Sequence, residues 1–237
     1  MAKVKEIFFI ERSQFLIIIA LSFGMVGLTG ILYFHNDSPF HRFFGDVNPL
    51  AAFVVVSLLG ALLLSFLLSQ DWFAIYKKEN LKGLARSSAL AALLGMIMIL
   101  VDTQIVLPKD FNIPFPESLL FYPAIDYFVQ ILFHILPLTV LLIVLTAIFK
   151  NADHRHIVWI CILVVALLEP VYQTVMGFSS PIPLWAAAYI WIHVFIINLA
   201  ELIIFKRYDF ISMYAFRLVY YLFWHIGWGY FRLQILF

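Results

Sequence analysis

The chain has 237 residues, of which 64% are hydrophobic and 12% are charged, and its formal net charge is +1. A soluble domain of this length cannot bury so much apolar surface, so the composition excludes an ordinary soluble protein and indicates an integral membrane protein. The lipid bilayer is therefore the expected partner. Nucleic acid is not expected, because no block of basic residues is present.

Seven apolar segments follow one another, each close to the roughly 20 residues that cross a bilayer as a helix. They cover residues 14–34, 48–69, 88–107, 124–149, 157–177, 184–205 and 210–235. The first is longer than a signal-peptide core and has no clear cleavage site, so we expect it to be retained. No soluble domain or repeat separates the segments. The sequence predicts an all-α polytopic membrane bundle of about seven transmembrane helices, forming a single integral membrane domain over residues 1–237.

The basic residues of the connections alternate between the two sides of the predicted bundle. One side holds Lys3, Lys5, Arg12, Lys77, Lys78, Lys82, Arg86, Lys150, Arg155, Lys206 and Arg207, and the other holds only Arg42, Lys109 and Arg232. Because cytoplasmic loops are enriched in Lys and Arg, this pattern predicts a cytoplasmic N-terminus and an external C-terminus. The short architecture without tails favours a prokaryotic plasma membrane.

The fourth segment carries a polar stripe. Asp126, Gln130 and His134 recur every four residues and therefore share one helix face, and Pro137 follows and loosens the helix. Ionisable groups within a bilayer are costly, and they mark functional sites by default. The alternative is that the stripe only bonds neighbouring helices together.

The fifth segment places Glu169 beside Pro170, deep in the predicted membrane. A buried carboxyl group tuned by its surroundings can act as a general base, so we expect Glu169 to be catalytic. Tyr172 and Gln173 share its face and are expected to orient it. The alternative is a protonated glutamate bonded to a neighbouring helix.

Two further segments contribute candidates. On the sixth, His193 and Glu201 share a face, and Glu201 is expected at the cytoplasmic interface. On the seventh, Arg217, Tyr221 and His225 lie four residues apart, and Arg217 needs a partner because a buried unpaired charge is too costly.

These candidates are expected at one depth. His134, Glu169, His193 and His225 each lie eight to ten residues from the external end of a segment. With a rise of 1.5 Å per residue, all four are placed roughly 12–15 Å below the outer surface. The sequence therefore predicts one site formed by four helices.

The C-terminal half, about residues 124–230, resembles the CPBP family of CAAX prenyl proteases and bacteriocin-processing proteins. That family carries Glu-Glu-x-x-x-Arg, Phe-x-x-x-His and His-x-x-x-Asn motifs on successive spans. Here the segment that ends at His134 takes the place of the first motif, and the segment that ends at Glu169 takes the place of the second. The segment that begins at His225 takes the place of the third. The resemblance implies a glutamate-dependent intramembrane endopeptidase, acting on a peptide or lipidated peptide.

Several motif positions differ from the family pattern. Val129 and Gln130 replace the two glutamates, His134 replaces the arginine, Glu169 replaces the histidine and Gly229 replaces the asparagine. The residue types favour Glu169 as the base that activates water, His134 and His225 as groups that orient water, and Gln130 as a donor to an oxyanion. His193, Tyr172, Gln173, Tyr221 and Arg217 are expected to bind or orient the substrate.

Three alternatives remain open from the sequence. In the first, the chain is an inactive relative that acts as a partner-binding subunit. In the second, it is a carrier that uses the buried groups as a proton relay, although no inverted repeat is obvious. A metal or haem site is the third, since His134, His193, His225 and Glu169 are suitable ligand types. No close ligand pair supports it, so no cofactor is predicted. The sequence does not indicate an oligomeric state.

Overall fold

The protein is an all-α helical bundle, as the sequence predicted. The computed structural model describes residues 11–176 and 183–237, and all regular secondary structure within these ranges is helical. Six helices in the described ranges are long and apolar enough to cross a membrane. These helices identify an integral membrane protein. Lys3 and Lys5, which contribute to the predicted orientation, lie outside the described residues.

The six spans correspond to the first six predicted segments. They are α2 (Arg12–His35), α4 (Pro49–Ser69), α5 (Leu81–Ile105), the rod formed by α6 (Ser118–Val129), η3 (Gln130–Ile135) and α7 (Leu136–Ile148), the pair α8 (His154–Ala166) and α9 (Leu168–Met176), and α10 (Leu184–Arg207). Short connecting helices are α3 (Ser38–Phe44), η1 (Lys78–Asn80) and η2 (Lys109–Phe111).

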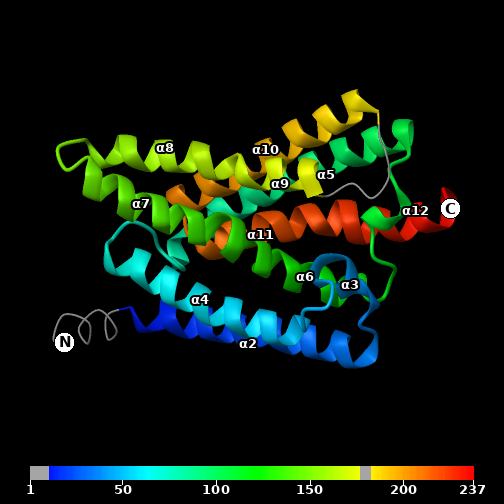
Figure 1. The fold of residues 1–237 in the computed structure, drawn as a ribbon, viewed down its shortest axis with the longest axis horizontal. Helices are drawn as coiled ribbons and strands as arrows, with labels where there is room; N and C mark the ends of the chain where they lie inside the picture. The colour runs from blue at the N-terminus through cyan, green and yellow to red at the C-terminus, as the bar shows by residue number, and fades with distance from the viewer. Residues whose placement is uncertain (1–10, 177–182) are drawn as a thin grey trace.

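The seventh predicted segment is also helical throughout, but it does not belong to the six most apolar helices. It consists of α11 (Phe210–Tyr221), the π-helical turn η4 (Leu222–Trp228) and α12 (Gly229–Ile235). Its polar residues, including Arg217, His225 and Arg232, reduce its hydropathy. In Figure 1 this segment runs through the middle of the bundle to the C-terminus.

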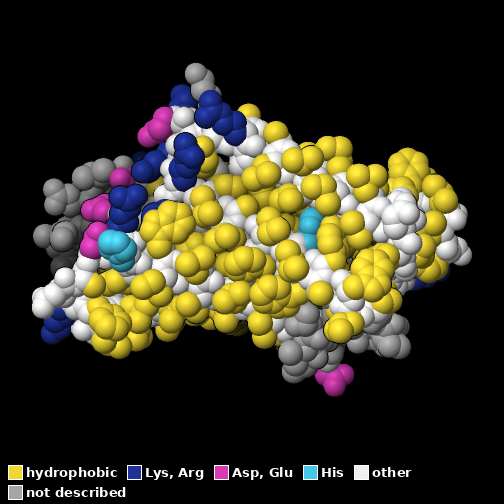
Figure 2. Space-filling view, turned by 90° about the horizontal axis from the view of Figure 1, so that it is seen from above, with side chains coloured by type: hydrophobic (Ala, Val, Ile, Leu, Met, Phe, Trp, Pro, Cys, Tyr) yellow, Lys and Arg dark blue, Asp and Glu magenta, His cyan; other side chains and the backbone are white. Residues whose placement is uncertain are grey.

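The bundle has α11 and α6 near its centre. Helices α2 and α4 pack together along one side, and α5, α8 and α10 lie on the other (Figure 1). Figure 2 shows basic side chains gathered at one end and a broad apolar surface beyond them. We call this the basic end; its exposed residues include Lys77, Lys78, Arg86, Lys150, Arg155 and Arg207.

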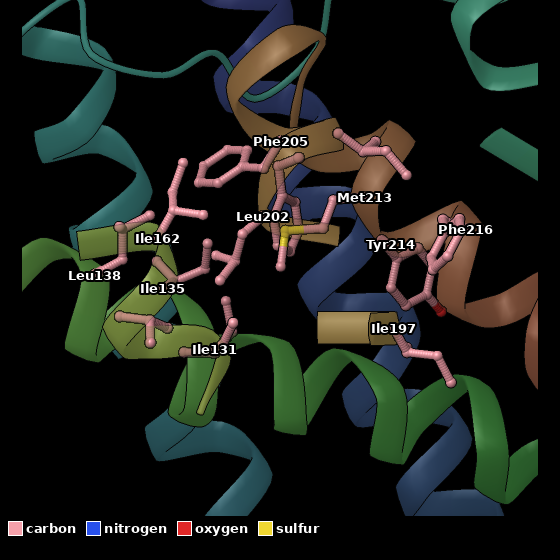
Figure 3. Packing of buried hydrophobic residues seen from close by; sticks show 14 of the residues in the cluster. Ile131, Ile135, Leu138, Ile162, Ile197, Leu202, Phe205, Met213, Tyr214 and Phe216 are labelled. Atoms are coloured by element: carbon pink, nitrogen blue, oxygen red, sulfur yellow. The ribbon is translucent and has the colours of Figure 1, made fainter. Parts of the chain in front are cut away.

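The core joins the helices that carry the polar candidates. Ile131, Ile135 and Leu138 from η3 and α7 meet Leu202 and Phe205 from α10 within one buried cluster (Figure 3). Many large apolar residues elsewhere remain exposed, as expected for helices that face lipid. Packing around α10 and α11 thus encloses their polar side chains, while apolar faces point outward.

Two helical rods lose their regular α-helical geometry beside the polar residues. Pro137 has no N–H group with which to bond the carbonyl of Phe133, and the turn before it is π-helical. Pro170 likewise cannot bond the carbonyl of Ala166, and α8 ends there before α9 begins. Both interruptions follow from single prolines within otherwise apolar segments.

A buried ion pair fastens the C-terminal helix to the rest of the bundle. Arg232 on α12 donates from Nε to Asp102 on α5 at 2.7 Å, and neither side chain is exposed. Arg232 also bonds the carbonyl of Leu107 and the side chain of Asn112. The predicted external loop residue Arg232 is therefore a buried anchor for the connection after α5.

We expect the substitution Arg232→Met to destabilise the bundle by about 3–5 kcal/mol, because it leaves the Asp102 carboxylate buried without a cation. The measurement is thermal unfolding of the purified protein in detergent. The double substitution Asp102→Asn with Arg232→Met should recover part of the loss. Arg155→Met, at an exposed position, serves as the control. Equal stability of the Arg232 and Arg155 variants would contradict the assignment.

Candidate functional site

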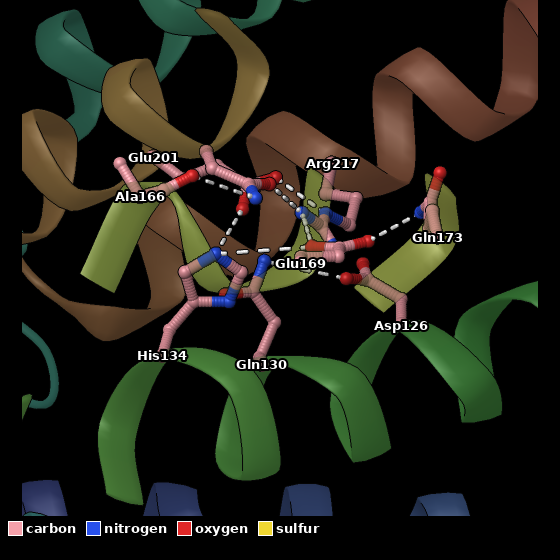
Figure 4. Close-up of polar contacts among 9 residues, drawn as sticks. Asp126, Gln130, His134, Ala166, Glu169, Gln173, Glu201 and Arg217 are labelled. Carbon is pink, nitrogen blue, oxygen red and sulfur yellow. Dashed lines mark hydrogen bonds and ion pairs between the residues drawn. The ribbon is translucent and has the colours of Figure 1, made fainter. Parts of the chain in front are cut away.

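Arg217 is the centre of a buried polar site. Its position on α11 directs the guanidinium group between α9 and α10 (Figure 4). Nε donates to Glu201 Oε1 at 2.6 Å, and NH2 donates to Glu169 Oε2 at 2.8 Å and to Asn198 Oδ1 at 2.6 Å. Only 2% of the residue is exposed. The partner that the sequence required for Arg217 is thus a pair of glutamates.

Glu169 is held from two directions. Both terminal nitrogens of Arg217 reach its carboxylate, with NH1 at 3.3 Å from Oε1. Gln173, one turn further along α9, donates to the same Oε1 at 3.0 Å. A carboxylate held by two guanidinium nitrogens is strongly stabilised in its charged form. This arrangement opposes the role of Glu169 as a base that accepts a proton from water.

His134 lies between the two glutamates. Its Nε2 is 3.6 Å from Glu201 Oε2 and 3.9 Å from Glu169 Oε2. Neither ring nitrogen has a described partner at the distance and angle of a regular hydrogen bond, although Asn198 and the backbone of Val129 lie nearby, and the ring is fully buried. Buried polar atoms are nearly always bonded in folded proteins, so this buried imidazole without a bonded partner is unusual.

The rest of the polar stripe completes the site. Gln130 donates to Asp126 Oδ1 at 3.3 Å, while Asp126 Oδ2 and Gln130 Oε1 have no partner among the described residues. We refer to the whole set as the Arg217 cluster. Its members are Asp126, Gln130, His134, Glu169, Asn198, Glu201 and Arg217.

Asn198 connects the cluster to the break between α8 and α9. Its Nδ2 is 3.4 Å from the carbonyl of Ala166, which is the carbonyl that Pro170 leaves without a helical partner. Its Oδ1 accepts from Arg217. The proline therefore does more than interrupt a helix, because the carbonyl that it frees holds the amide that orients Arg217.

His193 lies outside the Arg217 cluster. Its ring is near the hydroxyls of Tyr189 and Tyr220, at 3.4 Å from Nδ1 and 3.3 Å from Nε2. The sequence predicted that His193 and Glu169 lie at the same depth in the membrane, but equal depth does not bring the two side chains together. Helix rotation directs His193 toward two tyrosines instead.

His225 also has different neighbours. It lies in η4 and stacks on Tyr122 with ring centroids 4.5 Å apart, and Tyr221 meets it edge-on at 4.8 Å. No contact between His225 and Glu169 is present among the described residues. The structure therefore separates the one predicted water-orienting residue that matched the family motif from the predicted base.

The remaining orienting candidates divide in the same way. Gln173 contacts Glu169, whereas Tyr172 is 52% exposed and packs its ring against Phe133. Tyr221 contacts His225. Sequence spacing placed Tyr172 and Gln173 on one face, but only the second is turned inward.

Glu201 corrects the sequence interpretation. It was expected at the cytoplasmic interface, yet it is 0% exposed and paired with Arg217. Asn198, one turn earlier on α10, was not predicted as a site residue. Two features of the sequence could have identified both residues. Arg217 needs an acidic partner, and the i, i+3 spacing of Asn198 and Glu201 places them on one helix face.

The arrangement of the cluster does not form a metal site among the described residues. Within the described ranges, no three His, Cys, Asp or Glu side chains are placed to hold a metal ion. The cation at the centre of the cluster is the guanidinium group of Arg217 itself.

No family model, curated protein or solved structure matches the chain, so the resemblance to the CPBP family remains a prediction.

The substitution Arg217→Met should destabilise the protein by about 3–5 kcal/mol, since it leaves Glu169 and Glu201 buried together without their cation. Arg217→Lys should cause a smaller loss than Arg217→Met, because the lysine keeps a cation between the two glutamates. Some stability is still lost, because one ammonium group cannot reach all three partners at the distances observed. Thermal unfolding in detergent measures both. The control is Arg86→Met, an exposed position on α5. The interpretation is wrong if Arg217→Met unfolds at the control's temperature.

Proposed function

We propose that this protein is a proton-linked membrane carrier whose proton-binding groups belong to the Arg217 cluster. The supporting observation is the enclosure of that cluster: its ionisable side chains come from four helices, and each is at most 6% exposed. Intramembrane ionisable residues facing a bundle interior are typical of ion and proton pathways. An enclosed polar site suits a carrier in an occluded state.

The helix interruptions support the same function. Carriers bind their substrates and coupling ions where membrane helices are discontinuous, because the interrupted backbone and the polar side chains meet there. In this protein Gln130 and His134 lie on a π-helical turn, and Glu169 is the second residue of α9, just after the break between α8 and α9. π-Helical turns within α-helices often occur at functional sites.

The cluster also extends along the direction of transport. Eight residues separate Asp126 from His134, a distance of about 12 Å along a helix. Figure 4 shows His134 and Glu201 on one side of Arg217, and Asp126 and Gln173 on the other. We place the basic end in the cytoplasm of a prokaryotic cell, which makes His134 the more cytoplasmic end of the stripe.

A glutamate-dependent intramembrane peptidase is the second candidate. One observation favours it: three of its four predicted catalytic residues, Gln130, His134 and Glu169, do come together (Figure 4). Two observations oppose it. Arg217 neutralises Glu169, and a peptide would have to reach a carboxylate that is nearly fully buried.

For the carrier, the test is internal acidification of proteoliposomes that contain a pH-sensitive dye and face an acidic medium. Pools of amino acids, dipeptides, organic acids and sugars are the probes. At least one pool should accelerate proton entry in the native protein, and His134→Ala should abolish that acceleration, because the unpartnered imidazole is then lost. His156→Ala removes an exposed histidine and should leave the flux unchanged. Failure of every pool to accelerate proton entry would refute the carrier.

For the peptidase, the test is mass spectrometry of membrane-peptide libraries after incubation with reconstituted protein. If the second candidate is correct, cleavage products appear and Glu169→Gln removes them while the protein stays folded. Glu79→Gln changes an exposed glutamate on η1 and should leave cleavage intact. The absence of products from the native protein, or equal cleavage by both variants, would eliminate this candidate.

A further inference from the structure

The Arg217 cluster contains more acidic groups than cations. Asp126, Glu169 and Glu201 contribute three carboxyl groups, and Arg217 contributes the only permanent positive charge among the described members. A buried site with two uncompensated negative charges is very unfavourable in a bilayer. Two protons must therefore be shared by the cluster when it is closed, and the geometry indicates which groups hold them.

Glu169 is the carboxyl group least suited to hold a proton. Both of its oxygens accept from Arg217, and Oε1 also accepts from Gln173. Three donated hydrogen bonds satisfy a carboxylate and leave little reason for it to bind a proton. Glu169 is thus the counter-ion of Arg217.

Glu201 differs from Glu169 at its second oxygen. Oε1 accepts from Arg217, but Oε2 has no partner among the described residues and is fully buried. His134 Nε2 lies 3.6 Å from Oε2, and the side chain of Gln130 is also close to the Glu201 carboxyl group. A small side-chain rotation brings these two atoms within ordinary hydrogen-bond distance. Asp126, whose Oδ2 is also unpartnered and which has no cation within bonding distance, accounts for the other proton.

We infer that the transferable proton of this site is shared between Glu201 Oε2 and His134 Nε2. In the transfer, the carboxyl O–H bond of Glu201 breaks and an N–H bond forms on His134, which converts a neutral pair into a carboxylate and an imidazolium. The charged and titratable groups that interact with the pair are Asp126 on α6, Glu169 on α9, and Arg217 and Tyr221 on α11. Arg217 stays charged throughout.

This assignment rests on the proposed function and deepens it, because it names the groups that bind the coupling proton. It also shifts the chemistry away from Glu169, which the sequence favoured as the base. Glu201 is connected to the basic end by the last two turns of α10, so a proton on the Glu201–His134 pair is close to that end.

The experiment is infrared spectroscopy of the protein in lipid bilayers, in H₂O and in D₂O, over a range of pH. Protonated carboxyl groups give a carbonyl stretching band that moves on deuteration. Two matched neutral substitutions each remove one neighbour: His134→Asn beside Glu201, and Gln173→Leu beside Glu169. We expect the titrating part of the band to shift in His134→Asn and to remain unchanged in Gln173→Leu.

A shift in Gln173→Leu alone would place the proton on Glu169 and overturn the inference, as would an unchanged band in both variants. A second measurement uses the native protein without a substitution. In the NMR spectrum of the protein with ¹⁵N-labelled histidine, one imidazole signal should titrate together with the carboxyl band. Because both measurements detect proton binding without transport, their failure is distinguishable from a failure to transport any probe.

Discussion

The buried guanidinium group of Arg217 is the constraint on which the arrangement of the C-terminal half depends. A charge at this depth is tolerated only when other groups compensate it, and here α9 and α10 each supply a glutamate. The pairing fixes how these helices are rotated about their axes. Together with Asp126, the two glutamates give the cluster three carboxyl groups and one guanidinium group.

Proline and asparagine make this arrangement possible. A regular helix through Glu169 would use the carbonyl of Ala166 internally, but Pro170 frees it and Asn198 binds it. The same amide then holds Arg217 through its oxygen. The break between α8 and α9 and the charge site are therefore parts of one structure, and a change in either would move the other.

A second buried arginine serves a different purpose. Arg232 is paired with a single carboxylate, Asp102, and its remaining donors are taken by Asn112 and by backbone carbonyls. Every group there has a partner, so the arrangement is suited to holding the end of the chain in place. The Arg217 cluster, in contrast, combines more carboxyl groups than cations with a buried imidazole that has no bonded partner among the described residues.

The sequence by itself determined the all-α membrane bundle, because hydrophobic length and composition decide which segments cross a bilayer. It also identified most of the buried ionisable residues, since such residues are rare in apolar segments. It could not decide which of them meet. His134, His193 and His225 looked equivalent by depth, yet only His134 joins Glu169, while the others face tyrosines. Glu201 looked interfacial but is the second partner of Arg217. The prolines that interrupt the helices are visible in the sequence, but the rotation of each helix arises from contacts between segments far apart in the chain, and that rotation decides which polar residues meet.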